Sequence, residues 1–296
     1  MDEQELNDYK KAGSIAKQVV AYAKSIIKKD MPLVEIAQKI HKKIEDLDAL
    51  PAFPVNLSID DVAAHYHPTI EDKTLATGLL KIDIGVHING FIADTAFSLD
   101  LTEDNQHKDL IQASQDALEA ALDLQNENPT LHQIGSTIQE TITKQGFSPI
   151  VNLSGHGLAQ YQVHAGLTIP NYGSSNNHKL DTGAYAIEPF ATTGVGKIHE
   201  GPSSNIFAIT NPKNTRGVTA RKILEFFSEK YQSLPFSLRE AQEKFGPMAR
   251  LAVRQLEQEG VLHHFAQLVE NSHKPVSQAE HTFLKTKEGK IIITTK

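Results

Sequence analysis

Two runs of alternating apolar and polar residues, separated by Asn89-Gly90, restrict the fold more than any other feature of the sequence. Residues 79–87 (LLKIDIGVH) and 92–99 (IADTAFSL) both have the two-residue period of a β-strand. Asn-Gly is the strongest short signal for a two-residue hairpin turn, since both residues tolerate positive φ angles. The sequence therefore predicts an antiparallel hairpin with strands of similar length.

This hairpin carries two acidic residues. A turn at Asn89-Gly90 places Asp83 opposite Ala96 and Asp94 opposite Gly85, so both carboxylates project from the same face of the sheet at diagonally adjacent positions. Two like charges in apolar surroundings are costly unless a cation neutralises them. Taken alone, the pair also fits two solvated aspartates on an exposed sheet face, and both readings stay open at this point.

Helical and extended patterns alternate along the first 210 residues, which indicates an α+β domain. Apolar residues recur at helical spacing in four segments: residues 12–27, 33–44, 110–124 and 131–143. Further extended runs are expected at 160–169, 182–190, 204–210, 279–286 and 289–295.

Residues 213–272 read as an inserted helical subdomain in a larger domain formed by residues 1–212 and 273–296. Helical patterns at 220–231, 238–245 and 248–259 follow one another with little strand between them. A winged helix that binds DNA is one interpretation. The segment has nine Lys or Arg against seven Glu and so lacks the basic stripe that phosphate contacts need. We therefore favour a packing and pocket-forming role, without specific DNA binding.

The composition excludes several classes of protein. The chain has no cysteine, which rules out disulfides, thiolate nucleophiles and Cys-ligated zinc, so any metal must be held by His, Asp and Glu. Its net charge of -7 disfavours general binding to nucleic acid or to anionic membranes. Because no secretory signal or membrane span is recognisable, a soluble, cytoplasmic protein is expected, and we expect a monomer.

Histidines and acids in four further segments are candidates for chemistry. SGHGLAQYQVHAG places His156 and His164 beside glycines that allow close approach of backbone or ligand. AYAIEPF places Glu188 in an otherwise apolar strand, where a buried carboxylate needs a partner. QAEHTFL places Glu280 just before another apolar strand, and AAHYHP places His65 after a run of small residues.

Together these residues supply four carboxylates and one histidine as ligands, a hard, oxygen-rich set that suits two divalent first-row ions. Two such ions lower the pKa of water and polarise a carbonyl, which favours hydrolysis of an amide at neutral pH. His65 and His164 would remain free to contact the substrate and the developing oxyanion.

The segments AAHYHP, KIDIGVHINGFIAD, SGHG, QVHAG, YAIEPFATTG and QAEHTFL resemble, in this order, the motifs of the methionine aminopeptidases. The distance of 92 residues between Glu188 and Glu280 is too long for the type 1 enzymes and accommodates the helical insertion that marks type 2. The short N-terminal region is similar to that of the archaeal members.

The resemblance implies a pita-bread fold with a winged-helix-like insertion, and an exopeptidase that removes the initiator methionine from nascent polypeptides near the ribosome, preferring a small second residue. It implies that two divalent ions (Co, Mn, Fe or Zn) are held by Asp83, Asp94, His156, Glu188 and Glu280, with Asp94 and Glu280 bridging. Glu188 would also handle a proton of the attacking water, His164 would contact the scissile carbonyl, and His65 would line the substrate site. The methionine pocket would consist of Phe53, Val163 and Phe265, while His67, where the family more often has threonine, has no role assigned.

Two alternatives remain. A proline-specific dipeptidase of the same fold would use the same ligands, although such enzymes usually carry a large N-terminal domain. A metal-free pita-bread binding protein would have replaced ligands, whereas all five ligand positions are filled here.

Overall fold

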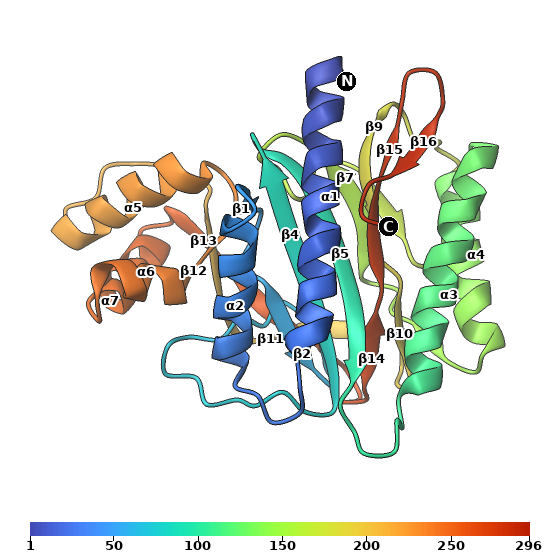
Figure 1. The fold of residues 1–296 in the computed structure, drawn as a ribbon, viewed down its shortest axis with the longest axis horizontal. Helices are drawn as coiled ribbons and strands as arrows, with labels where there is room; N and C mark the ends of the chain where they lie inside the picture. Colours follow the sequence, from blue (N-terminus) through green and yellow to red (C-terminus); the bar gives the residue numbers. More distant parts are fainter.

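A nine-stranded sheet forms the centre of the molecule in the computed structural model, which describes residues 1–296 (Figure 1). Its main path runs in the order β1–β4–β5–β15–β9–β7–β8, while β2 pairs with β4 and β16 pairs with β15. The strands are β1 (Leu50–Pro51), β2 (Asn56–Ile59), β4 (Leu79–Ile88), β5 (Phe91–Asp100), β7 (Ser154–Leu158), β8 (Thr168–Pro170), β9 (Gly183–Ile187), β15 (Glu280–Lys285) and β16 (Ile291–Ile293). The strand pairings in this sheet are all antiparallel.

The hairpin of β4 and β5 has the register that the sequence predicts. Asn89 and Gly90 both have positive φ angles, 53° and 85°, as the two-residue turn requires. Asp83 pairs with Ala96 and Asp94 pairs with Gly85. The prediction of the hairpin and of its two facing carboxylates is thus confirmed.

Four helices pack against the sheet as two pairs (Figure 1). Helices α1 (Glu3–Ile26) and α2 (Leu33–Glu45) bury an apolar core against β4 and β5, whereas α3 (Lys108–Leu124) and α4 (Leu131–Lys144) cover the half that contains β9 and β15. A short 3₁₀ turn, η1 (Gln125–Glu127), follows α3. Reciprocal capping boxes start α1 at Asp2 and α4 at Thr130, so the free amide groups of both first turns find acceptors.

The remaining strands form two smaller sheets. One has the order β14–β10–β6, built from β6 (Ser148–Pro149), β10 (Phe190–Thr192) and β14 (Val276–Gln278). The other has the order β12–β11–β13–β3, built from β3 (Val62–Ala64), β11 (Ile198–Ile209), β12 (Phe236–Ser237) and β13 (Leu262–Glu270). Strand β3 leads directly into His65, so the second sheet sets the position of that residue.

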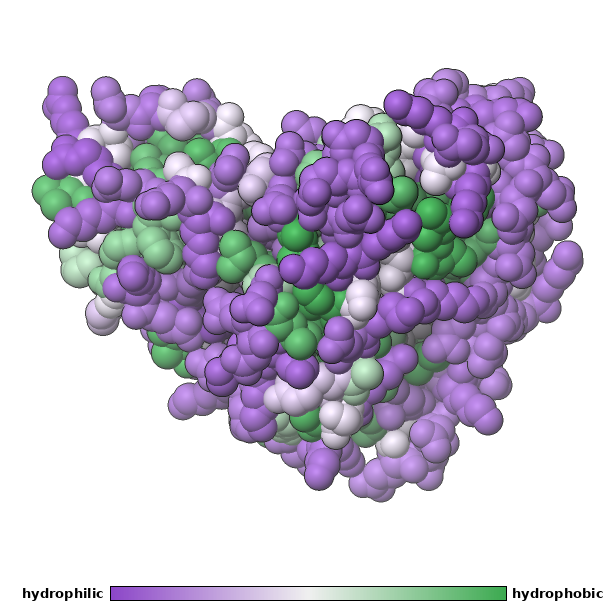
Figure 2. Space-filling model, turned by 45° about the horizontal axis from the view of Figure 1, so that its top comes forward, coloured by the Kyte–Doolittle hydropathy of each residue, from purple (hydrophilic) through white to green (hydrophobic).

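Three helices lie between β11 and β13: α5 (Val218–Tyr231), α6 (Leu238–Phe245) and α7 (Ala249–Gln258). Their apolar faces share a core cluster with Phe207 of β11 and Phe53. They form a lobe beside α2 (Figure 1). In the space-filling view, hydrophilic residues cover most of the visible face, and the outline is indented between this lobe and the rest of the molecule (Figure 2).

The sequence patterns located most elements, with a few clear errors. Residues 160–169, expected to be extended, form turns up to the short strand β8, and the strand that carries His156 lies earlier, at β7. Strand β11 begins at Ile198 instead of residue 204, and α1 begins at Glu3 instead of residue 12. No helix is long and apolar enough to cross a membrane.

Candidate metal and substrate site

Strand β5 places Asp94 at the bottom of a cavity, directly opposite Gly85. The ring of Phe53 fills the space that the missing side chain of Gly85 leaves here. A Cβ atom on Gly85 would lie only 2.3 Å from Cε1 of Phe53. The glycine thus admits an aromatic ring beside the Asp94 position and brings the apolar wall next to the acidic residues.

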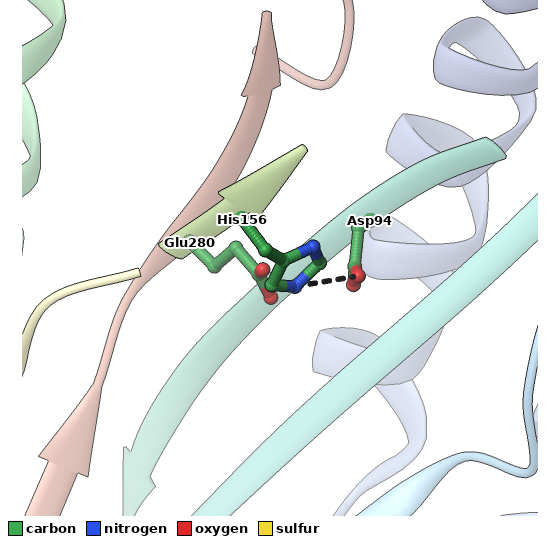
Figure 3. A group of neighbouring side chains, drawn as sticks. All are labelled: Asp94, His156 and Glu280. Carbon is green, nitrogen blue, oxygen red and sulfur yellow. Dashed lines mark ion pairs between the residues drawn. The ribbon is translucent and has the colours of Figure 1, made fainter. Parts of the chain in front are cut away.

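Asp94, His156 and Glu280 converge from three different strands, β5, β7 and β15 (Figure 3). One ligand atom of each lies within 4.8 Å of the others. Nε2 of His156 is 3.8 Å from Oδ2 of Asp94, the contact drawn as a dashed line in Figure 3. Glu280 pairs with Ala96 in the β5–β15 ladder, which sets it beside Asp83 and Asp94.

Glu188 and Asp83 complete the acidic group. Oε1 of Glu188 is 3.6 Å from Nε2 of His156. Glu188 lies in the break between β9 and β10, not within a continuous strand as expected, and the Pro189 that follows marks this break. Gln278 links the two carboxylates, since its Nε2 is 3.5 Å from Oδ2 of Asp83 and 3.4 Å from Oε2 of Glu188.

Burial and mutual repulsion disfavour the charged forms of these carboxyl groups. Burial first, and then the neighbouring carboxylates, raise the pKa values of Asp94, Glu188 and Glu280 well above their ordinary range. Burial raises the pKa of Asp83 to about 7 and lowers the pKa of His156 to about 3. Four acids that resist ionisation beside a neutral imidazole are the arrangement that a divalent cation stabilises.

Unsatisfied atoms point to the same conclusion. Oδ1 of Asp83 and Oδ1 of Asp94 are buried and accept no hydrogen bond. Buried polar atoms normally have partners, and a metal ion would supply one to both carboxylates. The donor set of carboxylate oxygens and one imidazole nitrogen suits divalent first-row metals. The residues present therefore fit a metal centre.

His65 and His164 face the same cavity from other elements. His65 follows β3 with a left-handed backbone (φ 66°), and its Nδ1 lies 3.2 Å from the Ala266 carbonyl. The His164 ring stands edge-on to His156 at 4.4 Å between centroids. Burial lowers the pKa of His65 to about 4 and also lowers the pKa of His164, so both imidazoles are neutral at pH 7.

Every residue predicted for the site lines this one cavity of about 310 Å³. Its apolar wall includes the predicted Phe53, Val163 and Phe265, and the ring of Phe265 lies 5.8 Å from that of His65. Pro235, which follows α5, also lines the cavity, so the segment between β11 and β13 contributes directly to it.

Asn56 and Gln278 belong to the site but were not predicted. Asn56 lines the cavity, pairs with Asp83 in the β2–β4 ladder and leaves its buried Oδ1 without a partner. No sequence signal reveals it, because the pairing of β2 with β4 is not readable from either strand. Gln278 could have been predicted from the sequence, because it lies two positions before Glu280. Side chains two positions apart in an extended chain project from the same face.

His67, for which no role was predicted, lies outside the cavity. It is completely buried, and its Nδ1 lies 2.8 Å from the Val55 carbonyl oxygen. Its Nε2 faces Nε of Arg239 in α6 at 3.2 Å.

Comparison with known proteins identifies the family of the chain. The model of metallopeptidase family M24 matches residues 7–219, which is most of the chain, and the protein belongs to this family. The methionine aminopeptidase of Pyrococcus abyssi is 43% identical over 289 residues, covering 96% of this chain and 97% of that protein. That of Archaeoglobus fulgidus is 39% identical over 299 residues and is covered completely by this chain. At these identities and coverages, the chain groups with the methionine aminopeptidases of the family.

Solved structures share the fold at low sequence identity. A thermophilic Arx1 superposes with a TM-score of 0.84 at 17% identity, covering 99% of this chain and 91% of that chain. The methionine aminopeptidase of Thermotoga maritima superposes with a TM-score of 0.72 at 20% identity, covering 100% of this chain and 98% of that chain. This likeness establishes the pita-bread fold and carries no further functional argument.

Proposed function

We propose that the protein removes the initiator methionine from new polypeptides by metal-dependent hydrolysis of the first peptide bond. One observation carries this proposal: the clustered metal-ligand side chains open onto a partly apolar cavity, in a chain closely related to methionine aminopeptidases over nearly its full length. The acids and the histidine supply the means for hydrolysis, and the cavity supplies the means to select the first side chain.

Five residues would hold two divalent ions. Asp83 would bind one ion, His156 and Glu188 the other, and Asp94 and Glu280 both. Such ions polarise a peptide carbonyl and lower the pKa of water. The convergence of Asp94, Glu280 and His156, together with the unpaired oxygens of Asp83 and Asp94, supports this arrangement.

Glu188, His164 and His65 would carry the proton transfers and the contacts to the substrate. An Oε atom of Glu188 would accept a proton from the attacking water and deliver it to the leaving amine, and its position beside His156 supports this role. His164 would donate a hydrogen bond to the oxygen of the scissile carbonyl, and its position against His156 supports this role. His65, held by the Ala266 carbonyl, would line the substrate site beside Phe265.

The apolar wall would select the first residue. Phe53, Val163 and Phe265 form a surface that suits an unbranched thioether. Norleucine should be accepted nearly as well as methionine, because replacing sulfur by methylene leaves no buried polar group unpaired. Alanine or glycine should bind worse, at about 0.8 kcal/mol for each buried methylene that is missing.

The remaining parts of the proposal concern organisation and partners. Residues 213–272 would be an insertion that serves the cavity, which the lining residue Pro235 supports, and this layout would make the enzyme type 2. The substrates would be N-termini of nascent chains met near the ribosome in the cytoplasm. The protein would act as a monomer, without binding DNA.

A series of peptides tests this function. The first and second positions are varied separately in Met-Ala-Ser, and the released amino acid is measured. We expect cleavage after methionine and norleucine, and a preference for small second residues. Equal cleavage of Leu-Ala or Ala-Pro peptides would replace this function by a broader aminopeptidase or a prolidase.

A further inference from the structure

The wall of the cavity is fixed through Val55. Residues 53–56, called the wall segment below, include two cavity-lining side chains, Phe53 and Asn56. The carbonyl of Val55, between them, accepts a hydrogen bond from Nδ1 of His67 at 2.8 Å, and its amide donates to Nε2 of His41 at 3.2 Å. The two imidazoles stack with 5.6 Å between centroids and 17° between planes.

Arg239 of α6 reaches both histidines from the helical insertion. Only 3% of this arginine is exposed. Its Nε donates to Nε2 of His67 at 3.2 Å, its Nη2 lies 2.7 Å from Nδ1 of His41, and its Nη1 donates to Glu243 at 2.9 Å. The insertion, α2 and the wall segment therefore meet at one buried cation.

The hydrogen bonds of His67 form one consistent relay. A neutral imidazole has one donor and one acceptor, and His67 uses Nδ1–H toward Val55 and Nε2 toward Arg239. His41 also has a single acceptor, for which the Val55 amide and the guanidinium compete. The fixed link from the insertion to the wall segment is thus the path Arg239–His67–Val55.

The same relay reaches His65. The backbone amide of His67 donates to the Ser204 carbonyl at 3.3 Å, and its carbonyl accepts from Nδ2 of Asn205 at 3.2 Å. His67 is therefore held on four sides, two residues after His65 with its left-handed backbone. Left-handed backbone in a non-glycine residue persists only where its surroundings fix it.

A buried arginine is a costly way to pack a helix. An apolar side chain of similar size often stabilises a protein as well as, or better than, a buried charge, so packing alone does not explain Arg239. The planar guanidinium has N–H donors at fixed angles, and it therefore holds the ring of His67 in one orientation.

We propose that Arg239, acting through His67, is a positioning residue that sets the wall segment and His65 relative to the metal ligands, and so makes the helical insertion a determinant of first-residue specificity. This inference rests on the proposed methionine-removing function. A purely structural Arg239 would affect stability but not the choice between first residues.

The test is Arg239→Met, with Arg250→Met as matched control. Arg250 belongs to the same insertion, but its side chain is half exposed and pairs with Glu71, which is not part of the wall segment. We measure kcat and KM for peptides that begin with Met, norleucine, Leu or Ala, and the metal content of each protein. Arg239→Met should lose roughly 10- to 100-fold in kcat/KM for Met peptides, the scale of a misplacement of about 1 Å. The ratio of kcat/KM for Met peptides to kcat/KM for Leu peptides should fall about tenfold, while the metal content stays the same. Arg250→Met should leave this ratio unchanged.

A double-mutant cycle tests whether Arg239 works through His67. If it does, Arg239→Met combined with His67→Phe should change the ratio of Met to Leu no more than either single variant. Arg239→Lys keeps the charge but loses the planar guanidinium, and it serves as the test if Arg239→Met does not fold. It should lower the ratio of Met to Leu cleavage in the same way.

An unchanged ratio in folded Arg239→Met or Arg239→Lys, or additive effects in the cycle, would overturn the inference. Failure of the wild type to release methionine would instead overturn the proposed function, so the two failures are distinguishable.

Discussion

Replacing Gly85 by alanine should push Phe53 into the cavity. The added Cβ would lie 2.3 Å from Cε1 and 2.6 Å from Cδ1 of the Phe53 ring. Ordinary contacts begin at about 3.4 Å, so the ring must move by about 1 Å, and the cavity is the open side. Gly85 lies in β4 without a positive φ angle, so alanine adds no backbone strain there.

We expect Gly85→Ala to lower stability by about 1–3 kcal/mol, the usual cost of overpacking. The displaced ring should lower kcat/KM for Met peptides by about 10²-fold. Ala-first peptides, which do not fill the cavity, should lose much less. Thermal unfolding measures the first effect and the peptide series the other two, and the metal content checks that the metal site is intact.

Two variants serve as controls. Gly183→Ala adds the same methyl group to the same sheet, where the nearest atom, Oη of Tyr185, is 3.1 Å away, and it should change specificity little. Gly85→Ala with Phe53→Leu shortens the clashing side chain and should recover part of the lost stability. Wild-type specificity in Gly85→Ala would refute the packing of Phe53 on Gly85.

Four further variants test the ligands, His164 and His67. Asp94→Ala or Glu280→Ala should empty at least one metal position and abolish activity, because a carboxylate between two cations offsets their repulsion; two bound metals with normal turnover in either variant would refute the ligand set. His164→Ala should keep its metals and slow turnover by roughly 10² to 10⁴, as single-turnover assays would show, and wild-type turnover would remove its role. Burial lowers the pKa of His67 to about 3. Below about pH 6.5 the imidazole is therefore protonated in the unfolded chain but not in the native state. The free energy of unfolding should fall as the pH drops from about 6.5 toward 3. Between pH 8 and 5.5 the wild type should lose about 1.4 kcal/mol more than His67→Gln in urea unfolding, and identical pH dependence of the two proteins would contradict this.

The sequence was most informative where a local rule decides the structure. The Asn89-Gly90 turn determines the β4–β5 register and thereby the shared face of Asp83 and Asp94. The residues from 238 to 245 have a helical period and coincide with α6. The early start of α1 was readable in principle, because Asp2 and Glu5 have the spacing of a capping box.

Contacts between distant segments could not be predicted from the sequence. The ring of Phe53 over Gly85 and the amide of Asn56 beside Asp83 depend on strand pairing that neither segment encodes alone. The link of His67 to Arg239 joins residues 172 positions apart. The prediction of an extended strand at 160–169 was wrong, because the residues with alternating polarity there form turns around His164 and no paired strand.

Release of methionine from Met-Ala-Ser by chelated protein, with each divalent metal added back, tests the central claim most directly. The chelated protein should release no methionine, and Co²⁺, Mn²⁺, Fe²⁺ or Zn²⁺ should restore release with up to two ions bound per chain. Unreduced release by protein shown to be free of metal would contradict the proposed function, as would no release with two ions bound.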